Sequence, residues 1–115
     1  MAKFLFWNVN SLHSQNDDTR DFGLAVSQIV REHTVDMVLL AECPSNIESI
    51  RDQLWAVRPF FSIPCSPRFA IFAGFSSEFI TRISPPVPSG RFEVFHLQLP
   101  LQTDVLIAVI HGWDR

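Results

Sequence analysis

The chain has 115 residues, enough for one domain at most and for a core of modest size. Apolar residues make up 47% of the sequence and charged residues only 18%, so we expect strands buried on both faces or an apolar surface that meets a partner. The net charge of −3 excludes a strongly basic overall surface, although a cleft can be locally positive in an acidic protein.

The first half of the chain alternates between strand-like and helix-like segments. The run at 4–7 is apolar on both faces, as in a central strand, and the run at 36–42 is a second strand of this type. Between them, apolar residues recur at helical spacing over 22–33. A Ser-x-x-Glu capping box at 45–48 opens a second helix, and we expect Trp55 to belong to its buried face.

Proline and glycine then separate a series of strand-like segments. These lie at 60–65, 69–75, 79–84, 91–99 and 104–111. In the alternating segment 91–99 we expect the polar residues Glu93, His96 and Gln98 to lie opposite the apolar ones. The order β-α-β-α followed by consecutive strands predicts a layered α/β (α+β) architecture, in a single domain that covers residues 1–115.

The two cysteines and the N-terminus indicate the cellular compartment. Cys43 and Cys65 have no zinc-ligand spacing, and we expect two reduced thiols, with a disulfide as the alternative. The start of the chain does not have the pattern of a signal peptide, and no apolar run approaches the roughly 20 residues of a membrane span. The sequence therefore predicts a cytoplasmic protein.

Polar side chains stand where three of the predicted strands end. Asn8 follows the first strand, Glu42 closes the second and His111 closes the last. If the first two strands are parallel neighbours, Asn8 and Glu42 emerge at the same carboxyl edge, where ligand sites of open α/β sheets form. Amide and carboxylate oxygens suit Mg²⁺ or Mn²⁺, and a histidine at such an edge can act as a general base or acid near pH 7.

At these residues the sequence resembles the endonuclease/exonuclease/phosphatase family. The likeness rests on Trp7-Asn8-Val9-Asn10, on the helical pattern that follows, and on the strand that closes with Glu42. In that family these elements hold the catalytic metal, which implies that Asn8 and Glu42 are metal ligands. Asn10 matches the second asparagine of the motif, which implies that it shapes the site beside the phosphate.

The resemblance continues through the later strands. The strand 105–111 is similar to one that ends in a catalytic histidine in the deoxyribonuclease-like branch, which implies a catalytic role for His111. Arg91 resembles a phosphate-contacting arginine of that branch, and Arg68 is a further candidate for phosphate contact. The substrate implied is a phosphodiester, with nucleic acid among the options.

The resemblance covers only the N-terminal half of the family's domain. Ala41 stands where the family usually has glutamine, and Pro67-Arg68 stands where an acidic residue orients the histidine of the deoxyribonuclease-like branch. The Asp-x-Asn and Asp-His motifs belong to the second half of the family's domain. We therefore expect half of a four-layer α/β/β/α sandwich, with one sheet, helices on one side and a bare face. A homodimer or the missing C-terminal half would cover that face.

Three functions remain open. The first is a metal-dependent phosphodiester hydrolase of the nuclease type. The alternative is a degenerate, non-catalytic family member that acts as a protein-interaction or assembly module. The third is an unrelated α/β binding domain, which predicts that Asn8 and Glu42 do not converge. The substrate is not determined by such a fold.

Overall fold

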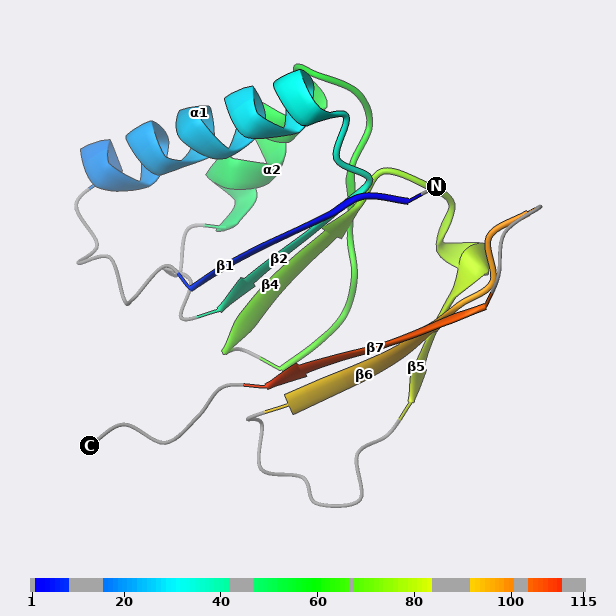
Figure 1. Cartoon of the computed structure of the whole chain (residues 1–115). Coiled ribbons are helices and arrows are strands. Elements are labelled where there is room, and N and C mark those ends of the chain that lie inside the picture. Colours follow the sequence, from blue (N-terminus) through cyan, green and yellow to red (C-terminus); the bar gives the residue numbers. More distant parts are fainter. Residues whose placement is uncertain are drawn as a thin grey trace.

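The computed structural model describes residues 2–8, 16–41, 47–66, 68–83, 92–100 and 104–110, with the backbone alone at 16–21. Its strands form two sheets, with the orders β1-β2-β4-β3 and β5-β6-β7 (Figure 1). The elements in chain order are β1 (Phe4–Asn8), α1 (Asn16–His33), β2 (Met37–Ala41), α2 (Ile47–Trp55), β3 (Phe61–Ser62), β4 (Phe69–Ala73), the 3₁₀ helix η1 (Ser77–Phe79), β5 (Ile80–Ile83), β6 (Phe92–Leu97) and β7 (Val105–Ile110).

The first sheet is arranged around β2. This strand pairs in parallel with β1 and antiparallel with β4. A parallel pair needs a crossover connection, and α1 lies between β1 and β2 in the chain. All five residues of β2 are buried, because helices cover one face of the sheet and other strands cover the opposite face. Burial on both faces explains why the sequence of β2 is an uninterrupted apolar run.

Both helices cover the same face of the first sheet (Figure 1). Phe22 and Val26 of α1 share one buried cluster with Ile50 of α2. The helix predicted over 22–33 is confirmed, but α1 already begins at Asn16. Its first turns are polar, so no apolar spacing marked them. No helix in the described part of the chain combines the length and apolarity needed to cross a membrane.

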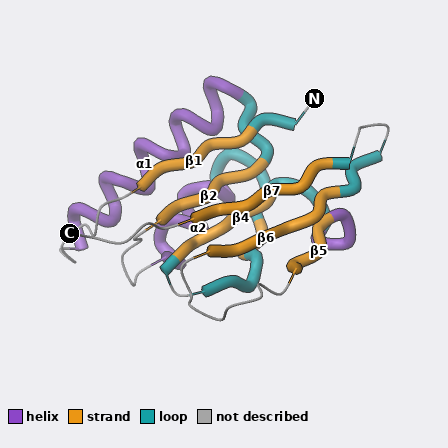
Figure 2. Tube along the Cα trace, turned by 60° about the horizontal axis from the view of Figure 1, so that its bottom comes forward, coloured by secondary structure: helices purple, strands orange, loops and turns teal. Residues whose placement is uncertain are grey.

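The second sheet packs on the other face of the first (Figures 1 and 2). Phe95, Leu97 and Val109 of the second sheet lie in one buried cluster with Leu39 and Ile71 of the first. The layers are therefore α/β/β, and the predicted layered α/β fold is confirmed. The expectation of one sheet with a bare face is wrong. The later strands form a sheet of their own, and this sheet covers the apolar face of the first.

Apolar surface remains open along two strands instead. In the described part of the chain, β1 and β7 each pair on one side only. Leu106 and Ile110 of β7 are 67% and 69% exposed, and Phe6 of β1 is 53% exposed. An apolar cleft of about 360 Å³ adjoins both strands and is lined by Phe4, Phe6, Leu39, Ile107, Ala108, Val109 and Ile110.

Trp55, which we expected in the core, is 48% exposed. Its Nε1–H donates to the carbonyl oxygen of Phe60 at 2.7 Å, and its ring meets that of Phe61 edge-on, with centroids 5.8 Å apart. The side chain lies at the last turn of α2, where it packs against the segment leading into β3. An indole placed this way keeps its N–H paired while part of the ring stays in solvent.

A polar cluster joins the segments where β1 and β2 begin, and we call this side of the first sheet the amino edge. Asp36 accepts hydrogen bonds from the backbone N–H of Lys3 at 2.9 Å and from Arg58 Nη2 at 3.2 Å. Arg58 also donates to the carbonyl oxygen of Val35. A Cβ at Gly74 would lie 3.2 Å from Arg58 Nη2, so the missing side chain leaves room for the guanidinium.

Candidate functional site

The candidate site lies where β1 and β2 end. The register places Asn8, the last residue of β1, opposite Ala41, and it places Ala41 opposite Phe69, the first residue of β4. In the sequence, Glu42 directly follows Ala41 and Arg68 directly precedes Phe69. The ends of β1 and β2 and the start of β4 therefore lie in a row at one edge of the sheet, with β2 in the middle.

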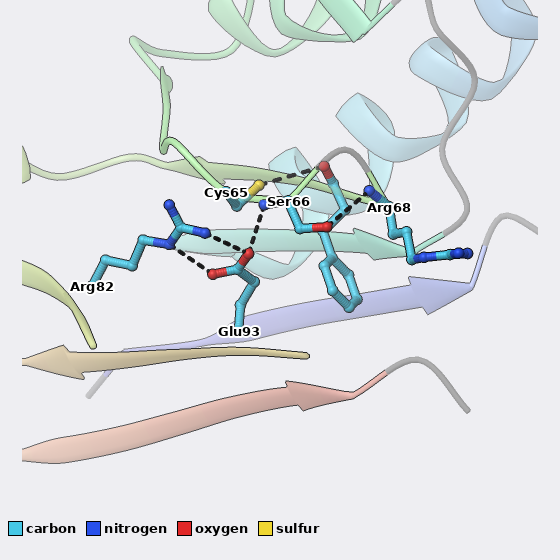
Figure 3. Close-up of polar contacts among 6 residues, drawn as sticks. Cys65, Ser66, Arg68, Arg82 and Glu93 are labelled. Carbon is cyan, nitrogen blue, oxygen red and sulfur yellow. Dashed lines mark hydrogen bonds and ion pairs between the residues drawn. The ribbon is translucent and has the colours of Figure 1, made fainter. Parts of the chain in front are cut away.

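The second sheet has its corresponding edge on the same side. Ile110, the last residue of β7, pairs with Phe92, the first residue of β6. Figures 1 and 3 both show β2 and β7 pointing to one side of the molecule, and β1 runs parallel to β2. We call this side the carboxyl edge, defined by the strand-end residues Asn8, Ala41, Phe69, Phe92 and Ile110.

Two of the predicted site residues, Asn8 and Arg68, lie in the described part of the chain. The other four, Glu42, Asn10, Arg91 and His111, lie outside the described residues. Their roles stay predictions. The described strands that adjoin three of them, β2, β6 and β7, reach the carboxyl edge.

Asn8 is exposed at the end of β1. Leu5 of the same strand packs against the helical side of the sheet, and side chains alternate along a strand, so Phe4, Phe6 and Asn8 share the opposite face. The amide oxygen of asparagine is a hard ligand. Together with a carboxylate after Ala41, it is the donor type that Mg²⁺ or Mn²⁺ binds. Within the described residues there is no group of three or more His, Cys, Asp or Glu side chains arranged to hold a metal ion.

Glu93 is a buried carboxylate beside this edge (Figure 3). Its side chain is 1% exposed. Arg82 Nε donates to Oε1 at 2.8 Å and Arg82 Nη2 donates to Oε2 at 2.9 Å. The backbone N–H of Ser66 also donates to Oε2, at 2.6 Å. These bonds compensate for the loss of water around the charge, and they tie the second sheet to the loop before β4.

The same loop carries Arg68. The backbone N–H of Arg68 donates to Ser66 Oγ at 3.3 Å, and the N–H of Phe69 donates to the Ser66 carbonyl at 3.0 Å. The Arg68 side chain is exposed and extends away from Glu93 in the direction in which β1 and β2 run (Figure 3). No hydrogen bond or ion pair joins its guanidinium to any other residue that the structure describes. An unpaired guanidinium is suited to bind an anion such as phosphate.

Cys65 adjoins this network and is a free thiol. Its Sγ donates to the carbonyl oxygen of Phe69 at 3.4 Å. Burial raises the pKa of Cys65 to about 11, and the negative charge of Glu93 contributes in the same direction. The hydrogen bond to Glu93 raises the pKa of Arg82, so this guanidinium stays charged. Cys43 lies outside the described residues.

Glu93 was not predicted as part of the site, because the polar residues of segment 91–99 were expected on the solvent-exposed face of the strand. In β6 the buried residues are Glu93, Phe95 and Leu97, whereas Phe92, Val94 and His96 lie on the outer face. A strict period of two already places Glu93 with Phe95 and Leu97. This alternation was the signal in the sequence that Glu93 is buried. A charged side chain on a buried face indicates a partner of opposite charge, which here is Arg82.

No protein-family model and no curated protein sequence matches the chain. Solved structures do. An endonuclease/exonuclease/phosphatase family protein from Leptotrichia buccalis is 12% identical, with a TM-score of 0.66 over 96% of this chain and 53% of that one. Truncated TDP2 from Caenorhabditis elegans is 16% identical, with a TM-score of 0.62 over 97% of this chain and 46% of that one. TDP2 from D. rerio, complexed with single strand DNA product, is 15% identical, with a TM-score of 0.58 over 93% and 44%.

The chain thus spans about half the length of the structures that it matches. At these identities the likeness concerns the fold and leaves the chemistry open. The resemblance found in the sequence is confirmed at that level: this chain has the fold of the N-terminal half of an endonuclease/exonuclease/phosphatase domain.

Proposed function

We propose that this chain is the N-terminal half of a metal-dependent phosphodiester hydrolase of the nuclease type. The observation that supports this most is the strand register at the carboxyl edge. Asn8 lies opposite Ala41, which precedes Glu42 in the sequence, and Ala41 lies opposite Phe69, which follows Arg68. An amide oxygen, a carboxylate and an arginine are the groups that binding a metal and a phosphodiester requires.

The residues of the chain have separate roles in this proposal. Asn8 and Glu42 hold Mg²⁺ or Mn²⁺, which when bound would supply positive charge to a phosphoryl oxygen and to the leaving oxygen. Arg68 and Arg91 bind the phosphate group and orient it, and Asn10 lies beside it. In hydrolysis water adds to phosphorus, the P–O bond to the leaving alcohol breaks, and the leaving oxygen gains a proton. His111 assists this proton transfer or holds the phosphate.

The first test is cleavage of single-stranded DNA and of a chromogenic phosphodiester by the complete protein, this chain together with the second half of the domain, in the presence of Mg²⁺. Glu42→Gln should reduce turnover at least about 100-fold, because loss of even an outer-shell partner of a metal ligand costs 10- to 100-fold. The matched control is Glu78→Gln, at an exposed glutamate of η1. Binding of Mn²⁺, followed by calorimetry, should weaken in the first variant and not in the second. Unchanged turnover in Glu42→Gln would refute the metal role.

The open strands favour a second candidate, a non-catalytic interaction module. β1 and β7 contain no charged residue and no proline, the devices by which exposed strand edges usually avoid pairing with other chains. A second copy of the chain, or the other half of the compared fold, would pair with these strands and fill the cleft between them. If the chain binds a partner through this surface and cleaves no phosphodiester, the module is the better account.

Light scattering on the chain, with and without Mg²⁺, tests the self-association. A dimer of twice 13.1 kDa is expected if a second copy covers β1 and β7. Phe6→Lys should then give monomers, whereas Leu24→Lys, on an exposed position of α1, should not. A well-folded wild-type monomer contradicts the dimer. The cytoplasmic location stays a prediction, with which the free thiol of Cys65 agrees.

A further inference from the structure

Glu93 differs from the other acidic side chains that the structure describes in being almost fully buried. It lies in the row of Phe95 and Leu97 that packs against the first sheet. Burial of a carboxylate is costly, and an ion pair in such a place is often no more stabilising than apolar residues of the same size. A general contribution to stability therefore gives a poor explanation for a charge at this position.

An apolar side chain could not accept the backbone N–H of Ser66. This N–H is buried with the rest of Ser66, and the 2.6 Å bond to Glu93 satisfies it. Two hydrogen bonds from Arg82 hold the carboxylate in the orientation that this acceptor role requires. Arg82 comes from β5 and Glu93 from β6, so the second sheet holds a loop that belongs to the first.

Hydrogen bonds to Ser66 in turn fix the position of the Arg68 backbone. Ser66 accepts from the N–H of Arg68 through its hydroxyl and from the N–H of Phe69 through its carbonyl. From this backbone the Arg68 side chain extends toward the carboxyl edge (Figure 3). A long, exposed arginine loses much rotational freedom on meeting a ligand, and a fixed backbone limits how much more must be ordered.

We propose that Glu93, oriented by Arg82, is a positioning residue that holds the loop from which Arg68 binds a phosphate of the substrate. The inference rests on the proposed function, since it takes the ligand of Arg68 to be a phosphodiester. Glu93 and Arg82 act through the Ser66 backbone and do not themselves touch the ligand.

The test is a double-mutant cycle on binding of a short fluorescein-labelled oligothymidylate, measured by anisotropy without divalent metal. Arg68→Ala and Glu93→Gln should each weaken binding roughly fivefold to tenfold, as expected for one charge-assisted contact. The double variant should bind no more weakly than Arg68→Ala alone, because Glu93 acts through Arg68. Losses that multiply in the double variant would overturn the proposal.

Two further variants separate positioning from stability. Arg82→Lys keeps the charge but cannot form the paired hydrogen bonds to Glu93, so it should weaken binding in wild type and not in the Arg68→Ala background. Val109→Ala, in the same buried layer, should lower the melting temperature without changing the oligothymidylate affinity. If Glu93→Gln does not fold, the Arg82→Lys cycle alone decides. Val109→Ala and Glu93→Gln are compared at matched stability. If both lose the same affinity, Glu93 does not act by positioning the Arg68 loop.

The outcomes also distinguish this proposal from the proposed function. Weaker binding in Arg68→Ala, with wild-type affinity in Glu93→Gln and Arg82→Lys, overturns the positioning role and leaves the phosphate contact intact. Equal affinity in wild type and Arg68→Ala overturns the phosphate contact itself, and the positioning role with it.

Discussion

Arg58 and Arg68 lie on opposite edges of the same sheet and are used in opposite ways. At the amino edge, Arg58 donates to Asp36 and to the carbonyl of Val35, and it lies over the ring of Phe60 at 5.2 Å. At the carboxyl edge, the Arg68 backbone is bonded to Ser66, while its guanidinium pairs with no residue that the structure describes. Arg58 therefore joins segments of the fold, whereas the guanidinium of Arg68 is free for the phosphate contact proposed above. The residue type alone therefore says little about its role.

The largest expected effect concerns Cys65, beside the carboxyl edge. Burial raises the pKa of Cys65 from the usual 9.0 of a cysteine to about 11, so the thiolate fraction near pH 8 should be roughly 100-fold lower than for an exposed thiol. In a Cys43→Ser background, alkylation by iodoacetamide at pH 8 should be at least about tenfold slower, because the greater nucleophilicity of a more basic thiolate offsets part of its lower abundance. A rate equal to that of a small-molecule thiol contradicts the burial.

The same shift gives a pH dependence of stability. The folded state holds the Cys65 proton more tightly than the unfolded state, so this contribution is complete below pH 9.0 and is lost as pH rises toward about 11. The free energy of unfolding should fall across that window, and it should fall less in Cys65→Ala. Urea titrations at pH 8, 9, 10 and 11 measure the difference between the two proteins.

The next effect contrasts the two edges directly. Arg58→Ala removes hydrogen bonds from a charged donor to Asp36 and Val35, so it should lower the free energy of unfolding by about 2 kcal/mol. Arg68→Ala removes an exposed side chain and should change stability by less than about 0.5 kcal/mol. Urea unfolding of both variants checks the contrast. A loss of stability in Arg68→Ala as large as that in Arg58→Ala would show that Arg68 also fastens the fold.

The smallest effect is on the salt dependence of binding. Loss of one phosphate contact to a single strand reduces the slope of log K against log salt by about 0.7. Arg68→Ala should show this reduction, and Arg58→Ala, at the amino edge, should keep the wild-type slope. Titrations of the oligothymidylate at several salt concentrations provide the slopes. Identical slopes in all three proteins contradict the phosphate contact.

Much of the fold was predictable because its strands and helices have strong local patterns. The apolar run of β2 and the helical spacing of α1 each identify their element without tertiary information. The ends of elements were less predictable, as the early start of α1 at Asn16 shows, since polar first turns have no apolar spacing. Trp55 was misplaced because its position at the end of α2 depends on the segment that passes beside it.

In the candidate site, too, some features could be predicted from the sequence and others could not. Asn8 and Glu42 were predicted as site residues because each stands at the end of an apolar run in the sequence, where the pattern changes abruptly. The pairing of Arg82 with Glu93 could not be predicted, because the two residues lie on different strands and the carboxylate reaches a loop of the other sheet. The roles of Glu42, Asn10, Arg91 and His111 stay predictions.

By itself, the sequence determined the order of strands and helices and the polar residue Asn8 at the end of β1, since both depend on local spacing and on residue type. Tertiary structure decided that the later strands form a second sheet, and that this sheet packs on the first. It also decided that the Glu93 carboxylate accepts hydrogen bonds from Arg82 and from the N–H of Ser66. Such contacts join residues distant in the chain, and only the packing of the two sheets brings them within hydrogen-bonding distance.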